Sequence, residues 1–462
     1  MSDDDRPAAV PSASPALADA PPVRQPRGIY LLFTVEMWER FSFYGMRAIL
    51  VLFIADSARG GMGWSHATAS RLFGLYGFFA YALPVVGGYI ADRFWGTHRS
   101  LVVGAVVIAA GHFSMAVPTT PTFFLGLALV AIGTGFFKVN ASTMVGQLYQ
   151  PGDPRRDAGF TIFYMGVNVG ALVGQIACGY LGESPRWGWH YGFGAAGVGM
   201  LCGLAFYLKF RPRYLAGIGD PPSRAVAATR AASAPLTREE RDRMAALIVI
   251  MLFTIPFWLA YEQAASSMNF FAEQRTDRMV HGFQVPASWF QSVNPGVLII
   301  ASPLFAALWT ALGRRRREPS TPAKMAAALV LLGVGFLFMV AGARRGDGGA
   351  LVSPWWLVAA YTFHTFGELC LSPIGLSLVT KLTPAKFAAV TMGLWFLSTG
   401  IAELLAGQIA AITDKVARGE LFHLFGGQAD FYFIFVALSA ASALALVACG
   451  PWLRRRMHGL DS

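Results

Sequence analysis

The hydrophobic and polar residues of this chain alternate in long blocks. Apolar stretches, each able to cover roughly 30 Å of hydrocarbon as a helix of 1.5 Å rise per residue, are separated by short polar segments. The pattern predicts an all-α polytopic membrane protein with twelve transmembrane helices. These are expected at residues 29–55, 68–91, 100–117, 122–149, 157–181, 190–210, 244–272, 287–312, 322–343, 354–382, 387–414 and 428–453.

A polar stretch at residues 211–243 divides the predicted helices six and six. It holds no apolar run long enough to span, so we expect a cytoplasmic linker that turns helical near Thr237–Arg243. The predicted organisation is a disordered tail (1–27), a six-helix bundle (28–210), the linker (211–243), a second six-helix bundle (244–453) and a short tail (454–462). Two such halves are typical of transporters that rock around a central site, although architecture alone names no substrate.

Composition and charge agree with a membrane protein. Charged residues make up 14% of the 462 residues and hydrophobic ones 55%, whereas soluble domains carry roughly 25% charged residues. The net charge of +11 comes from Lys and Arg that fall mostly in segments on one side of the predicted membrane. The positive-inside rule places that side, with both termini, in the cytoplasm. Contact with membrane lipids is therefore expected, and nucleic-acid binding is not. The compact loops suggest a bacterial inner membrane.

Charged residues inside the first predicted helix are the main functional signal. Residues 31–54 are apolar enough to span, yet they contain Glu36, Glu39, Arg40 and Arg47, which share one helical face with Tyr44. An ionised group at mid-bilayer costs at least a few kcal/mol, so such a stripe must face a partner or a watery cavity. We interpret it as a functional site; a structural ion-pair cluster that locks two helices is the alternative.

Further polar groups lie inside later predicted helices. Lys138 is deep in its helix, and Glu262, Glu368 and Glu403 lie in the second half of the chain; no role is assigned to Glu403 from the sequence. Neighbours on the same helical faces are Tyr164 with Asn168, Trp258 with Glu262, Glu368 with Ser372, and Trp395 with Thr399 and Glu403. Asn294 precedes Pro295, where we expect a helix interruption that frees carbonyl groups for a ligand. Gly166, Gly170 and Gly174 recur every four residues, which favours close helix packing.

Buried charges of both signs suggest what the site does. Cationic and anionic groups on opposite walls would suit a zwitterion, with one end binding a carboxylate and the other an ammonium group. A carboxyl group that alternates between a cationic partner and an apolar setting takes up and releases protons. Proton coupling follows as a hypothesis. Tyr44, Tyr81, Trp258 and Trp395 are candidates for the side-chain pockets.

Catalysis and metal binding are not expected. The four cysteines lie in or at the ends of apolar stretches without paired spacing, and histidines such as His112 and His364 are isolated. We expect no cofactor, with protons as the coupling ion.

Seven motifs in order resemble those of one family. They are ExxERFxFYGMR from Glu36, GGYIADRFWG from Gly87, FFKxN around Lys138, FYMGVNVGAL from Phe163, YEQ around Glu262, SVNP around Asn294 and GELCLSP around Glu368. This series resembles the proton-coupled oligopeptide transporter (POT/PTR) family of the major facilitator superfamily. The resemblance implies a major facilitator fold and a proton-coupled symporter that imports di- and tripeptides by alternating access, with peptidomimetic drugs as further candidate ligands. A monomer is the expected state.

The resemblance also implies roles for individual residues. Proton coupling would involve Glu36, Glu39, Arg40, Lys138 and Glu368; a gating salt bridge would join Arg47 to Glu262, and Lys138 with Glu368 would form a second charge switch. Arg40 and Lys138 would face the peptide carboxylate, and Asn168, Asn294 and Glu368 the amino end. The implied peptide-binding set is Arg40, Tyr44, Tyr81, Lys138, Tyr164, Asn168, Trp258, Asn294, Glu368, Ser372, Trp395 and Thr399.

Three sequence differences between this chain and members of the family make these expectations more specific. Some members carry a histidine seven residues before the tyrosine that matches Tyr81, but this chain has Gly74 there, so coupling must depend on carboxylates. The 211–243 segment is too short and polar for the two extra helices of many bacterial relatives. Nitrate transport is not expected, because the ExxER motif is intact.

Two other functions remain open from the sequence. Pocket aromatics and buried carboxylates would also serve a proton-driven exporter of drugs or metabolites, which would not require a free amino and carboxyl end on its substrate. A peptide sensor that binds without transport is the second alternative.

Overall fold

The computed structural model describes residues 24–150, 152–221, 237–346, 348–384 and 387–460. Helices dominate both halves of the chain. The first half contains α1 (Arg27–Ala55), α2 (His66–Ile90), the π-helical turn η1 (Ala91–Trp95), α3 (Gly96–Met115), α4 (Thr120–Gln147), α5 (Arg156–Glu183) and α6 (Trp189–Tyr214).

The second half adds a small β-hairpin and several short helices. Its elements are α8 (Arg238–Tyr261), η2 (Glu262–Ala265), α9 (Ser267–Gln274), β1 (Met279–Val280), β2 (Phe283–Gln284), η3 (Ala287–Ser292), α10 (Val293–Arg314), α11 (Thr321–Gly346), α12 (Trp355–Leu382), α13 (Ala388–Ala410), α14 (Thr413–Ala417) and α15 (Gly427–Met457). The two strands pair antiparallel, with Val280 opposite Phe283.

Several helices begin where the sequence supplies a capping side chain. Ser65 accepts a hydrogen bond from the backbone N–H of Thr68 at the start of α2, and Thr119 does the same for Thr122 at the start of α4. Thr237 and Glu240 form a reciprocal capping box at the start of α8. Such caps satisfy backbone donors that have no partner within the helix. The helix predicted near residues 237–243 is therefore confirmed.

The predicted transmembrane segments coincide with helices of the structure. Within the described residues, nine helical stretches are long and apolar enough to cross a membrane, and one of these, His66–Met115, contains both α2 and α3. Helix α1 is outside that set because every 18-residue window in it holds more than two charged side chains. Helices α6 and α8 extend into both ends of the predicted linker, and α15 continues beyond residue 453. Residues 1–23 and 222–236 lie outside the described part of the chain.

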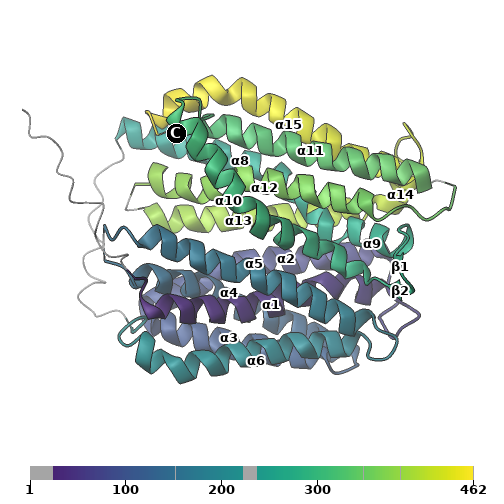
Figure 1. Cartoon of the computed structure of the whole chain (residues 1–462), viewed down its shortest axis with the longest axis horizontal. Coiled ribbons are helices and arrows are strands. Elements are labelled where there is room, and N and C mark those ends of the chain that lie inside the picture. Colours follow the sequence, from purple (N-terminus) through teal and green to yellow (C-terminus); the bar gives the residue numbers. More distant parts are fainter. Residues whose placement is uncertain (1–23, 151, 222–236, 347, 385–386, 461–462) are drawn as a thin grey trace, which may run out of the picture.

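The long helices run side by side in two groups (Figure 1). Helix α1 packs against α5 and α6 in the first group, and α11 packs against α12 and α15 in the second. The groups meet where α2 contacts α13 and where α5 contacts α10 and η3. The described chain starts and ends at the same end of the molecule, which we call the terminal end; the β-hairpin lies at the opposite end, the hairpin end.

Helices α1 and α5 are unusually close. A Cβ atom added to Gly166, Gly170 or Gly174 would lie 2.8, 2.1 or 2.3 Å from a backbone carbonyl oxygen of α1. No larger residue fits at these positions without moving the helices apart. The close packing that the glycine spacing predicts is confirmed.

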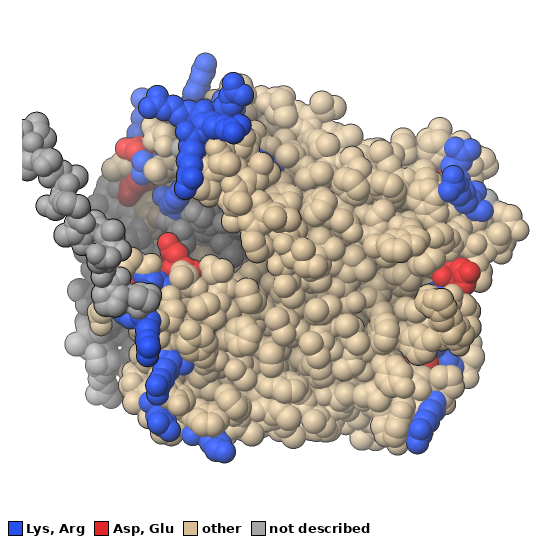
Figure 2. Space-filling model, viewed as in Figure 1, with Lys and Arg blue, Asp and Glu red and all other residues tan. Residues whose placement is uncertain are grey.

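Charged side chains avoid the middle of the face shown in Figure 2. Lys and Arg gather at the two ends, most of them at the terminal end, and a broad band between carries other residues. Large apolar side chains such as Ile300, Leu304 and Leu444 are strongly exposed, at 72%, 66% and 72%. In water such a surface would be unfavourable, whereas in a bilayer it contacts lipid. The protein is therefore a multi-pass membrane protein.

Candidate functional site

The charge stripe of α1 is buried and forms an ion cluster. The Arg40 guanidinium lies 3.1 Å from the Glu36 carboxylate, one turn earlier, and also contacts Glu39. All three residues are buried, and Glu39 is completely inaccessible. The pairs meet the distance for an ion pair, but Arg40 Nη2, Glu36 Oε2 and both Glu39 oxygens lack an aligned hydrogen bond within the described residues. The cluster therefore has unused hydrogen-bonding capacity.

Arg47, two turns further along α1, joins the two groups of helices. Its guanidinium donates to Glu262 at 2.6 Å and to both oxygens of Glu403 at 3.0 and 3.1 Å. Glu262 lies in η2, where the regular helix α8 ends, and Glu403 lies on α13. The expected Arg47–Glu262 pair is thus present, and Glu403 adds a second carboxylate that sequence reasoning left without a role.

A cavity of about 150 Å³ lies between the two groups of helices. One wall comes from α1, α2 and α5, and the other from α8, η2, η3, α10 and α12. Charge of both signs lines it, because Arg47, Glu262 and Glu368 all reach it. The lining residues are Tyr44, Arg47, Tyr81, Tyr164, Val167, Asn168, Ala171, Gln175, Trp258, Tyr261, Glu262, Ala264, Ala265, Gln291, Asn294, Tyr361, His364 and Glu368.

Glu368 on α12 is held by neutral donors. Its Oε2 atom accepts a hydrogen bond of 2.7 Å from the Tyr261 hydroxyl and one of 2.9 Å from the Asn294 amide. The same amide nitrogen also donates to Thr365 at 3.0 Å. Because these donors carry no charge, the carboxylate keeps its attraction for a cation that enters the cavity.

Lys138 contacts an aromatic ring. Its Nζ atom lies 3.6 Å from the centre of the Tyr81 ring on α2, within the range of a cation–π interaction. It is within electrostatic range of Glu36, Glu39 and Arg40. The structure does not bring Lys138 and Glu368 together: the two residues lie on helices of different groups, and each has the other partners described above.

Several predicted peptide-binding residues lie away from the cavity. The residues that do not line it are Arg40, Lys138, Ser372, Trp395 and Thr399. The Thr399 hydroxyl bonds to its own helix, at the Trp395 carbonyl. A position shared on one helical face therefore did not ensure contact with the cavity, because none of the described lining residues lies on α13.

The expectation of a helix interruption at Asn294–Pro295 is wrong. Pro295 occupies the first turn of α10, where a helix needs no N–H from that residue, and η3 precedes it. The carbonyl groups near it are therefore not freed for a ligand, and Asn294 reaches the cavity by its side chain alone.

Gly74 has a packing role. A Cβ atom at this position of α2 would lie 2.8 Å from the Glu403 carbonyl oxygen and 2.8 Å from the Gly407 Cα atom on α13. A Cβ at Gly77, one turn later, would meet the Glu403 carboxylate at 2.5 Å. A histidine at position 74 would force α2 and α13 apart, so these glycines give Glu403 the room to reach Arg47.

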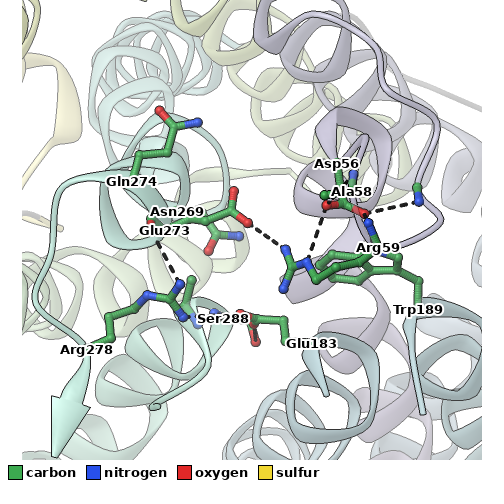
Figure 3. Close-up of polar contacts among 12 residues, drawn as sticks. Asp56, Ala58, Arg59, Glu183, Trp189, Asn269, Glu273, Gln274, Arg278 and Ser288 are labelled. Carbon is green, nitrogen blue, oxygen red and sulfur yellow. Dashed lines mark hydrogen bonds and ion pairs between the residues drawn. The ribbon is translucent and has the colours of Figure 1, made fainter. Parts of the chain in front are cut away.

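Polar contacts at the hairpin end join the two groups of helices (Figure 3). Arg59, just after α1, contacts Asp56 at 3.3 Å and Glu273 on α9 at 2.7 Å. Glu183, at the end of α5, accepts hydrogen bonds from the backbone N–H groups of Ala287 and Ser288 and from the Ser288 hydroxyl. Both sets connect one group of helices to the other.

Asp56 remains ionised in this cluster. Burial acts to raise its pKa, but hydrogen bonds from the Trp189 indole and from the backbone N–H of Arg59 outweigh that effect and hold the pKa below its usual range. The lowered pKa favours the carboxylate form of Asp56 beside Arg59.

Sequence reasoning missed part of this site. Tyr261 is adjacent to Glu262 in the YEQ motif, so its proximity to a charge was available as a signal, whereas Thr365 and Gln175 look like ordinary polar residues of a helix. Asp56, Glu183 and Glu273 lie at helix ends, where charged side chains are common and carry little information.

Comparison with known proteins identifies relatives along almost the whole chain. The sequence profile of the POT family matches residues 98–218 and 222–424. The chain is 36% identical to the peptide transporter YePEPT of Yersinia enterocolitica, covering 91% of this chain and 92% of that protein. It is 32% identical to a di-/tripeptide transporter of Lactococcus lactis, over 87% and 92% of the two chains.

Solved structures agree with these matches. A crystal structure of a peptide transporter POT in complex with sulfate superposes with a TM-score of 0.84 at 34% identity, over 95% of this chain and 97% of that one. A mutant of a peptide transporter POT in complex with alafosfalin superposes with a TM-score of 0.83, at the same identity and coverage. The fold is therefore that of the major facilitator transporters, and the chain belongs to the POT family.

Proposed function

We propose that this protein imports di- and tripeptides together with protons, by alternating access of a site between its two groups of helices. The observation that carries the proposal is a single cavity whose walls present Arg47 from α1 and Glu262 and Glu368 from the other group. Relatives named as peptide, dipeptide and tripeptide transporters support the substrate class. The complex with alafosfalin supports peptidomimetics as further ligands.

The amino end of a peptide would bind at Glu368. This carboxylate lines the cavity, and Asn294 beside it adds an amide that can adjust to the ligand. The carboxyl end would be drawn towards Lys138 and Arg40. These cations do not line the cavity but lie close to the Tyr81 and Tyr44 rings, which do, so the proposal requires the two rings to move aside or to mediate the attraction.

Charge balance supports coupling to protons. Arg47 faces two carboxylates, Glu262 and Glu403, and Arg40 likewise faces Glu36 and Glu39. Because an excess buried charge is costly, the Arg47 cluster is more stable when one of its carboxyl groups holds a proton or a further cation comes near, whereas Lys138 already lies within electrostatic range of Glu36 and Glu39. A peptide ammonium group or a moving lysine would change that balance, and a proton would be released or taken up. No cofactor is needed for this step.

The Arg47 cluster would act as the gate. It connects α1 with η2 and α13, and its partners would have to separate for the cavity to open at the hairpin end. The contacts of Arg59 with Glu273 and of Glu183 with Ser288 would break in the same movement.

The expected location is a bacterial inner membrane, with both termini in the cytoplasm and the hairpin end outside. The concentration of Lys and Arg at the terminal end supports this orientation. We propose that the transporting unit is a monomer in contact with membrane lipids, because the cavity is formed by one chain.

Uptake of labelled dialanine into proteoliposomes tests the proposal. We expect accumulation when the outside is acidic and the inside negative, and none without the gradient. Glu36→Gln and Glu368→Gln should lose accumulation, while exchange without a gradient survives in at least one of them. Intact binding without accumulation by the wild type would contradict import and favour an exporter or a sensor.

A further inference from the structure

Helix α5 presents a polar residue to the cavity beyond the positions discussed so far. Tyr164, Asn168, Ala171 and Gln175 follow one another at turn spacing, and all four line the cavity. Gln175 lies about 10 Å further along the helix than Asn168, at 1.5 Å per residue, in the direction of the hairpin end. It therefore belongs to the part of the cavity nearer the hairpin end.

Helix η3 packs directly against this part of α5. The Trp289 indole donates to the carbonyl oxygen of Ile176, next to Gln175, at 2.9 Å. One turn later, Gly179 leaves room for Ser288, because a Cβ there would lie 2.2 Å from the serine hydroxyl. Gln291 of η3 lines the same cavity. Two neutral amide side chains thus face the space at this end.

Gln175 has a buried amide oxygen without a partner. The residue is 6% exposed, and its Oε1 atom is buried without a hydrogen bond to any described residue. The other amides of the wall use their nitrogen atoms: Asn168 donates to the Tyr164 carbonyl, Asn294 to Glu368, and Gln291 to the Ala48 carbonyl. A buried acceptor without a partner costs stability, and this one belongs to a residue that lines the cavity, where a ligand can supply the missing donor.

We propose that Gln175 contacts the substrate and determines specificity, by accepting a hydrogen bond from a neutral N–H or O–H donor on a peptide side chain. This inference depends on the proposed peptide transport. With the amino end at Glu368, a side chain that extends towards η3 reaches Gln175. The amide oxygen then pairs with a donor such as a carboxamide or a hydroxyl group, whereas an apolar side chain of equal size leaves it unpaired.

Matched dipeptides test this assignment. Binding to the purified protein is measured for Ala-Gln against Ala-Met and for Gln-Ala against Met-Ala. In each pair the two side chains have nearly the same length, but only that of glutamine carries an N–H donor. Dialanine serves as the reference ligand. The variants are Gln175→Leu, which preserves size, and Gln147→Leu, the same change at an exposed position at the end of α4.

We expect the wild type to bind the glutamine-containing member of at least one pair about fivefold more tightly than its methionine analogue. Gln175→Leu should abolish that preference while its affinity for dialanine changes less than about twofold. Gln147→Leu should keep the wild-type preference. Without ligand, Gln175→Leu should unfold at a temperature no lower than the wild type, since it removes an unpaired buried acceptor.

Two results would overturn the inference alone: an unchanged preference in Gln175→Leu, or an equal loss of affinity for every dipeptide together with a lower unfolding temperature. The second result would assign Gln175 to packing. Failure of the wild type to bind any dipeptide, dialanine included, would instead overturn the proposed function and this inference with it.

Discussion

Arg47 and Glu403 form a bidentate ion pair between α1 and α13, in which Nη1 donates to Oε1 and Nη2 donates to Oε2. Glu262 shares the same guanidinium, so one cation serves two carboxylates. One cation with two carboxylates gives the cluster a net negative charge, unless one of the two carboxyl groups is protonated.

Replacement of Glu403 by Gln should uncouple transport from the proton gradient. The remaining pair of Arg47 and Glu262 is neutral without a proton, so one reason for proton uptake is removed. We expect gradient-driven accumulation of dialanine to fall at least about tenfold, while exchange without a gradient persists. Proteoliposome uptake measures both. Glu239→Gln, at the exposed start of α8, is the control, and wild-type accumulation by Glu403→Gln would refute the role.

Loss of the Tyr261 hydroxyl should weaken peptide binding. Tyr261→Phe removes the 2.7 Å hydrogen bond to Glu368 and, within the described part of the chain, leaves only Asn294 as a hydrogen-bond donor to that carboxylate. A hydrogen bond to a charged group is worth about 1.5 to 3 kcal/mol, so we expect the apparent KM for dialanine to rise about tenfold. Concentration-dependent uptake measures it. Tyr432→Phe removes a hydroxyl that bonds to the Ser267 carbonyl and should have little effect on KM; equal effects of the two changes would indicate general destabilisation.

Glu183 should stabilise the state in which the hairpin end is closed. In Glu183→Gln, the new amide group presents donors to the N–H groups of Ala287 and Ser288, and at least one of these contacts is lost. We expect the apparent Tm to fall by about 3 °C or more. A cysteine introduced on the cavity wall should also react faster with an external thiol reagent. Glu420→Gln, a change at an exposed surface pair, is the control; unchanged Tm and labelling would show that Glu183 does not hold the closed state.

The contribution of Asp56 to stability should depend on pH in a defined direction. Its pKa is lower in the folded protein than in the unfolded chain, so its stabilising effect is fully present above the unfolded value, about 3.9, and is lost as the pH falls through the folded value. Asp56→Asn should therefore unfold at a lower temperature than the wild type at pH 7. The difference should stay constant down to about pH 5 and shrink below about pH 4. Thermal unfolding across this range checks it, and a gap that widens on acidification would contradict the assignment.

The sequence predicts the α1 cluster well and the partners of its residues only in part. Charges within an apolar helix are rare, and Glu36 and Arg40 are neighbours along one helix, so their contact follows from helical geometry. The contact between Arg47 and Glu403 depends on how α1, α2 and α13 pack, which helical periodicity does not determine. For the same reason the sequence did not separate Trp258, which lines the cavity, from Trp395, which does not.

Contacts at helix ends were the least predictable. Arg59, Glu183 and Ser288 lie in or beside short connections, where neither hydrophobic periodicity nor a motif distinguishes a partner from a solvated charge. The unpaired state of Gln175 is likewise invisible in the sequence, because it is a property of the surrounding side chains.

The glycine contacts between α1 and α5 have a mechanical consequence. Three carbonyl oxygens of α1 pack directly against Gly166, Gly170 and Gly174. This close packing prevents one helix from sliding or rotating against the other. Helices α1 and α5 must then move as one rigid unit. This unit carries the ionisable residues of α1 together with the ligand-facing residues Asn168 and Gln175. A movement of the charged residues therefore also moves the residues that face the peptide. The flexibility that transport needs must come from other contacts, those with α8, α10 and α13.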